Sequence, residues 1–177
     1  VKLGVRDSKK LTDADMLKIG PLLMERIPHS LLIVTPQKYN QVHEENNLNA
    51  IKAKLHNQAY INLAKKIELP SFKIIDQFTP ETSYYRYLKN EPQIIRGIHF
   101  ETKAEDKYLS VAVGSIISRY GFLKTWEEME QKYDITFPKG SGDKVDILAQ
   151  EFVDRYGFER LGEVAKLHFK NTEKIRV

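Results

Sequence analysis

The chain has 177 residues, of which 41% are hydrophobic and none is cysteine, and its formal net charge is +4. This composition suits one globular domain, and the lack of cysteine excludes disulfide frameworks, thiolate zinc sites and cysteine nucleophiles. No apolar run approaches the roughly 18 residues of a spanning helix, and no secretory signal pattern is present, so we expect a cytoplasmic protein that uses no membrane. The positive charge permits an anionic partner such as a nucleic acid.

The first half of the chain predicts a helix, a strand and a second helix. Residues 12–26 begin with a threonine and two acids, which is typical of a capped helix N-terminus. Residues 30–35 form a short apolar run that predicts a strand, closed by the proline that follows. Apolar residues at helical spacing then predict a long amphipathic helix over 47–66.

The second half predicts two strands, each followed by a helix, and then a loop and two further helices. In chain order these are strand 72–76, helix 80–88, strand 94–100, helix 104–133, loop 137–142 and helices 144–156 and 158–168. Strands that alternate with helices indicate an α/β fold. Three strands make a thin sheet for this length, and the sequence starts abruptly without methionine. We therefore expect further strands upstream of Val1.

Carboxylates follow both predicted strands of the second half. Asp76 ends the first of these strands, and Glu101, Glu105 and Asp106 follow the second. Acids that converge at the end of a sheet can hold Mg²⁺, which takes few carboxylates and leaves room for water and phosphate oxygens. Each acid also has a plainer interpretation. Asp76 can form a turn, and the later acids can complement the dipole of a helix that begins there.

Small side chains, tyrosines and basic residues mark other segments. The small residues of 110–118 predict close packing against another element, and the tyrosines of 83–87 predict packing at the rim of the core rather than a protein-interaction scaffold. Ser8, Lys9 and Lys10 precede a helix N-terminus, where backbone amides add affinity for phosphate. The loop that begins at Lys139 lacks the spacing of a P-loop. His168 is typical of a surface or capping histidine.

Taken together, these residues resemble bacterial ribonuclease HIII, within the type 2 ribonuclease H family, over nearly the whole chain. The resemblance is carried by short segments in a fixed order: Gly4–Leu11, Leu55–Asn57, Ile75–Phe78, Glu101–Glu105, Val113–Arg119, Phe137–Gly140 and Leu167–Thr172. It implies a ribonuclease H-like mixed sheet flanked by helices. It also implies a monomeric endonuclease that cleaves the RNA strand of RNA–DNA hybrids with Mg²⁺ or Mn²⁺.

The resemblance further implies the roles of particular residues. The family uses four acids, of which the third matches Asp76 and the fourth matches Glu105, and Ser8, Lys9 and Lys10 are candidates for phosphate contacts. The first two family acids form an Asp-Glu pair in a glycine-containing motif, and no such motif precedes Asp76. We therefore expect residues 1–177 to be the C-terminal major part of a catalytic domain. Its N-terminal strands and substrate-binding platform would be missing, so that this chain alone is inactive. The alternative is a catalytically incomplete domain that only binds nucleic acid.

Overall fold

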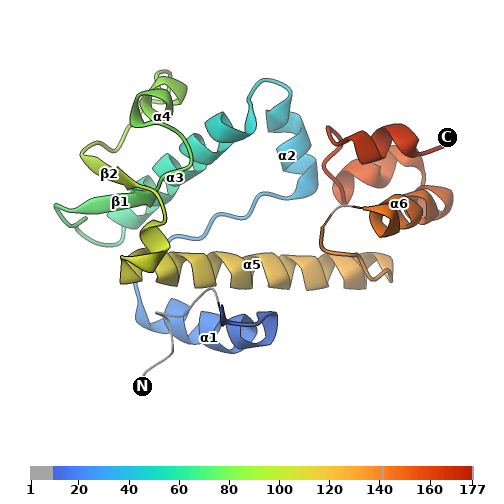
Figure 1. Cartoon of the computed structure of the whole chain (residues 1–177), viewed down its shortest axis with the longest axis horizontal. Helices are drawn as coiled ribbons and strands as arrows, with labels where there is room; N and C mark the ends of the chain where they lie inside the picture. Colours follow the sequence, from blue (N-terminus) through green and yellow to red (C-terminus); the bar gives the residue numbers. More distant parts are fainter. Residues whose placement is uncertain (1–9, 141, 177) are drawn as a thin grey trace. The chain divides into compact units, whose positions relative to one another are not determined.

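The computed structural model describes residues 10–140 and 142–176 and divides into two compact units. The first unit comprises Val1–Ile33 and Asn46–Lys124, and the second comprises Val34–Glu45 and Thr125–Val177. Helix α5 (Leu109–Tyr133) contributes residues to both units (Figure 1). No helix in the described part of the chain is long and apolar enough to cross a membrane.

In the first unit, helix α1 (Asp13–Arg26) packs against α5. The predicted N-terminus is confirmed, because the Thr12 hydroxyl accepts a hydrogen bond from the Asp15 backbone N–H while the Asp15 carboxylate accepts from Thr12. Arg119 of α5 donates two hydrogen bonds to the Asp13 carboxylate. The apolar residues between the two helices form one core cluster: Met16, Leu23, Val113, Ile116, Ile117 and Leu123.

The same unit contains a small β-α-β layer built on helix α3 (Leu48–Ala64). Strand β1 (Lys73–Asp76), helix α4 (Glu81–Tyr87) and strand β2 (Ile98–Glu101) follow it, and the two strands pair in parallel (Figure 1). A helix between them is expected, since parallel neighbours need a crossover connection. Buried residues from all four elements and the end of α4 form a second cluster: Ala53, Ile75, Tyr84, Leu88 and Ile98.

Two polar side chains of α3 bind the backbone of this layer. The Tyr60 hydroxyl accepts from the Ile74 N–H and donates to the Ile74 carbonyl, so it satisfies β1 on the edge that does not face β2. The Asn57 side chain is 2% exposed; its amide nitrogen donates to the Gln93 carbonyl and its oxygen accepts from the Ile95 N–H. Helix α3 therefore fixes both β1 and the segment that leads into β2.

The second unit contains helix α2 (Pro36–His43), the end of α5, helix α6 (Asp143–Tyr156) and two 3₁₀ turns, Phe158–Glu163 and Lys170–Lys174. Its core is formed by buried apolar residues: Tyr133, Ile135, Phe152, Val153 and Leu161. Next to this core, the Tyr133 hydroxyl, the Arg160 guanidinium and the Lys132 ammonium donate to Glu163 and lower the pKa of its carboxyl group to about 2.

The α/β fold class and most predicted helices are confirmed, but the strand expected at residues 30–35 is wrong. This segment is not a strand, and the sheet of the described residues contains only β1 and β2. One of its apolar residues is accounted for by packing, because the partly buried Leu31 lies against the first core cluster, whereas Ile33 is 54% exposed. The proline taken as the end of a strand instead starts α2, whose N-cap Thr35 accepts from the Lys38 N–H.

Three further boundaries differ from the sequence prediction. Strand β2 starts at Ile98 rather than residue 94, since Gly97 has a φ of +67° and the Asn57 side chain takes the backbone hydrogen bonds before it. The predicted helix over 104–133 is a 3₁₀ turn (Ala104–Asp106) followed by α5. The last predicted helix ends as a 3₁₀ turn at Glu163, because Asn40 binds the Gly162 and Ala165 carbonyls.

The small residues of α5 were expected to pack closely against another element, but only some of them do. Ala112 is 1% exposed, but Gly114 is exposed, and a Cβ added there would meet no described atom within 4 Å. Close approach occurs elsewhere: a Cβ on Gly20 would lie 2.5 Å from the Tyr120 Cβ, and one on Gly121 would lie 3.0 Å from Leu31. The tyrosine segment lies deeper than predicted, since Tyr84 is completely buried.

Candidate metal centre

Asp76 lies at the carboxyl end of β1, where the sequence predicted it. The strand buries Ile75, which is 3% exposed, and the alternation of side chains along the strand leaves Asp76 exposed. In the parallel register Asp76 lies opposite Glu101, the last residue of β2. The two strands therefore place two carboxylates at the same end of the sheet, where both strands finish.

The turn after β2 brings the segment of Glu105 against the end of β1. Lys103 adopts a left-handed conformation, with a φ of +56°, and turns the chain back toward the sheet. Ala104 is then completely buried, and its backbone N–H donates a hydrogen bond to the Asp76 Oδ1 over 3.0 Å. Glu105 follows directly in the 3₁₀ turn. The expectation that the Asp76 and Glu105 carboxylates share an ion stays a prediction, although the backbone places their segments in contact.

The carboxylate of Asp76 has one oxygen engaged and one available. Oδ1 accepts from Ala104, and among the described residues Oδ2 makes no hydrogen bond or ion pair. An oriented carboxylate with one oxygen left for a ligand fits a hard divalent cation, which prefers oxygen donors. Within the described residues, however, no group of three or more His, Cys, Asp or Glu side chains is placed to hold a metal. Asp76 and Glu105 fit such an ion as part of a ligand set.

Glu101 is engaged differently from Asp76. Lys107 Nζ donates to its Oε1, and the Tyr108 hydroxyl and His99 Nε2 contact its Oε2 at 2.8 and 3.1 Å. The hydrogen bonds from Lys107, Tyr108 and His99 lower the pKa of the Glu101 carboxyl group to about 2. This carboxylate is therefore ionised and occupied at both oxygens.

Only one of the three candidate phosphate contacts lies among the described residues. Ser8 and Lys9 lie outside the described residues, while Lys10 is exposed just before α1. The first turn of α1 carries its own acids, Asp13 and Asp15, and the Thr12 hydroxyl already accepts from the Asp15 amide. The Asp15 amide is therefore not free to bind phosphate, and the proposed role of Lys10 rests on its charge.

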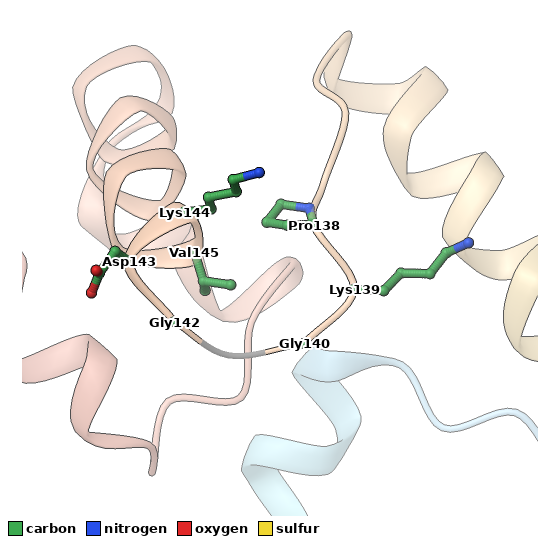
Figure 2. A pocket seen from close by; sticks show the side chains of 7 residues that line it. All are labelled: Pro138, Lys139, Gly140, Gly142, Asp143, Lys144 and Val145. Atoms are coloured by element: carbon green, nitrogen blue, oxygen red, sulfur yellow. The ribbon is translucent and has the colours of Figure 1, made fainter.

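A hollow of about 360 Å³ lies in the second unit at the loop before α6 (Figure 2). Figure 2 shows the Lys139 and Lys144 side chains starting from separate segments of the chain, with their ammonium groups well apart, and Asp143 pointing away from both. Gly140 and Gly142 have φ values of +141° and +142°, a backbone conformation that favours glycine at both positions. The charges of the described loop residues do not converge on one point, so residues 137–140 and 142 form no phosphate cradle of the P-loop kind.

Known proteins are similar to this chain in sequence. A family model described as Ribonuclease HII matches residues 1–172. The chain belongs to the ribonuclease HII family. It is similar to ribonuclease HIII of Listeria monocytogenes serotype 4b (strain CLIP80459), with 44% identity over 98% of this chain and 58% of that protein. Ribonuclease HIII of Streptococcus gordonii is 46% identical over 99% of this chain and 60% of its own length. This chain thus spans less than two thirds of these relatives.

A solved structure supports the same family membership. The crystal structure of Bst-RNase HIII in complex with Mn²⁺ superposes with a TM-score of 0.94 and is 40% identical, covering 97% of this chain and 57% of that one. The resemblance of this chain to ribonuclease HIII and the ribonuclease H-like α/β fold are confirmed.

Sequence reasoning missed the residues that support the site. In the sequence, Asn57 stood out only as part of a family segment. No sequence pattern predicted a role for Tyr60, Lys107 or Tyr108. A polar residue on the buried face of a predicted helix, such as Asn57 among Ala53 and Ile61, is a usable signal, because a buried amide needs partners. The Glu101 contacts had no comparable signal.

Proposed function

We propose that this chain is the C-terminal major part of a catalytic domain that hydrolyses the RNA strand of RNA–DNA hybrids with Mg²⁺ or Mn²⁺. Family membership supports the reaction class, and the Mn²⁺ complex of a protein 40% identical to this chain supports a divalent metal. One observation carries the proposal: the Asp76 carboxylate, at the end of β1, is oriented by the N–H of the residue that precedes Glu105.

In this proposal Asp76 and Glu105 hold the metal. Asp76 contributes Oδ2, because Ala104 fixes Oδ1, and the exposed position of Asp76 leaves room for a phosphate oxygen and water. When bound, a divalent ion supplies Lewis-acid stabilisation of the phosphate and lowers the pKa of a bound water. The buried Ala104 and the paired strands keep the carboxylate in place, so little reorganisation accompanies the reaction.

Recognition of the hybrid would rest on backbone charge, groove shape and 2′-hydroxyl groups, since helical RNA is read in this way. Ser8, Lys9 and Lys10 are the proposed phosphate contacts. A monomeric, cytoplasmic protein is part of the proposal.

A second candidate is a domain that binds nucleic acid without cleaving it. One observation favours it: the described residues contain no group of three or more His, Cys, Asp or Glu side chains placed to hold a metal. Under this proposal, metal binding by the 177-residue chain is weak and its cleavage activity absent. The two candidates differ only in whether a protein of the relatives' length that contains this chain cleaves the hybrid.

A cleavage assay tests the proposal. A labelled RNA–DNA hybrid is incubated in Mg²⁺ or Mn²⁺ with the 177-residue chain, with a protein of the relatives' length that contains it, and with the Asp76→Asn variant of that protein. We expect cleavage only by the unchanged longer protein, while Asp76→Asn retains hybrid binding, because phosphate affinity comes mainly from lysines. Asp154→Asn, an equally conservative change of an exposed carboxylate on α6, is the matched control. Wild-type-like cleavage by Asp76→Asn would remove Asp76 from the site.

A further inference from the structure

We propose that Glu101 is a positioning residue that clasps the turn 102–106 and thereby holds Glu105 against Asp76. Glu101 is the last residue of β2, and its partners Lys107 and Tyr108 come directly after the 3₁₀ turn. The side-chain contacts therefore join the two ends of the turn that presents Glu105. This inference rests on the proposed function, because it assigns the clasp to the same metal centre.

The turn needs such a clasp. Lys103 is in the left-handed region, which residues other than glycine seldom adopt, so the native backbone must be held by contacts around it. Inside the turn, one backbone hydrogen bond reaches across to Asp76, from the Ala104 N–H. Charge-assisted hydrogen bonds are stronger than neutral ones, so the Lys107–Glu101 contact is well suited to keep the turn closed.

The contacts of Glu101 distinguish it from a metal ligand. Lys107 occupies Oε1, whereas the Tyr108 hydroxyl and the His99 ring share Oε2. Three donors, one of them an ammonium, already engage both oxygens, so a cation would have to compete with the Lys107 charge for this carboxylate. At the same end of the paired strands, Asp76 Oδ2 makes no hydrogen bond or ion pair with a described residue, so the two strand-end acids have different tasks.

An aromatic side chain supports the clasp from outside. The Phe72 ring lies 5.6 Å from the His99 ring and 5.7 Å from the Tyr108 ring, centroid to centroid. It touches both neighbours that share Glu101 Oε2, and it reduces their freedom to turn away. The Glu101 side chain is 23% exposed, compared with 57% for Lys107, so the carboxylate is the more shielded partner of the pair.

Amide exchange at Ala104 measures the clasp directly. In Glu101→Gln of this chain we expect the Ala104 N–H to exchange about three- to tenfold faster, because the turn opens more often without the charged contact. Lys107→Met removes the same contact from the other side and should behave alike, whereas Lys107→Arg keeps the charge and should restore slow exchange. Glu91→Gln breaks a different ion pair of the same unit, with Lys54, and should leave Ala104 unchanged.

Mn²⁺ titration followed by paramagnetic broadening of the Asp76 and Ala104 signals gives a second readout. We expect broadening to require about threefold more Mn²⁺ in Glu101→Gln, with an unchanged melting temperature. If Glu101→Gln folds and its Ala104 exchange is unchanged, the proposal is overturned. If Glu101→Gln does not fold, the Ala104 exchange of Lys107→Met decides in its place. Absence of Mn²⁺ broadening at Asp76 in the wild-type chain would instead count against the proposed metal site, and the exchange result would still judge the clasp.

Discussion

The contact between α1 and α5 predicts that one substitution has opposite effects at two helical glycines. Gly20 is buried in α1 with its Cα facing Tyr120, whereas Gly114 is exposed on α5. Replacing glycine by alanine inside a helix stabilises it by about 0.5–1 kcal/mol when nothing else changes. Gly114→Ala should therefore raise the free energy of unfolding by about that amount and the melting temperature by roughly 1–4 °C.

At Gly20 the same methyl group meets a fixed obstacle. It would lie 2.5 Å from both the Cβ and the Cγ of Tyr120, and the Cβ moves only with the α5 backbone. Overpacking of this kind costs about 1–3 kcal/mol, and the upper end applies because no flexible side-chain end can move aside. Pro21 follows, and its ring also disfavours a Cβ on the preceding residue in a helix. After subtraction of the gain in helix propensity, Gly20→Ala should lower the free energy of unfolding by about 2 kcal/mol.

Urea unfolding followed by far-ultraviolet circular dichroism measures both variants against the wild type. We expect the two unfolding free energies to differ by about 3 kcal/mol, with Gly114→Ala above the wild type and Gly20→Ala below it. Equal shifts of the same sign would refute the reasoning, because helix propensity would then outweigh the contact with Tyr120.

Three further predictions follow from the hydrogen bonds, the charges and the candidate site. Asn57→Ala should lower the free energy of unfolding by about 2–4 kcal/mol, because two part-buried backbone groups before β2 lose their partner; a loss below about 0.5 kcal/mol in urea would contradict this. Glu163 has a folded-state pKa of about 2 against an ordinary value of 4.5, so its stabilisation is present above about pH 4.5 and is lost as the pH falls toward 2. Glu163→Gln should flatten the pH dependence of the melting temperature in that window, and an unchanged acid limb would refute it. Mn²⁺ at about ten times its dissociation constant should stabilise the chain by about 1.4 kcal/mol, or roughly 3–6 °C, and should not stabilise Asp76→Asn.

Local chemistry in the sequence determined the helices and the place of Asp76. The capping box at Thr12 and Asp15 and the cap at Asn47 satisfy backbone amides within a few residues, so the starts of α1 and α3 can be predicted without the fold. Asp76 was located because an apolar run of strand length ends there. The family segments added the reaction class, which periodicity alone does not give.

Only the tertiary structure decided the elements that depend on distant partners. Residues 30–35 have strand composition, but they form no strand because no neighbour in the described sheet takes their backbone hydrogen bonds, and Leu31 is partly buried against α5 instead. Gly114 was expected to pack and is exposed, whereas Gly20 makes the close approach, since the choice depends on which helix lies opposite. The turn that joins Glu105 to Asp76 is likewise held by Ala104 and Glu101, whose contacts exist only once both strands have paired.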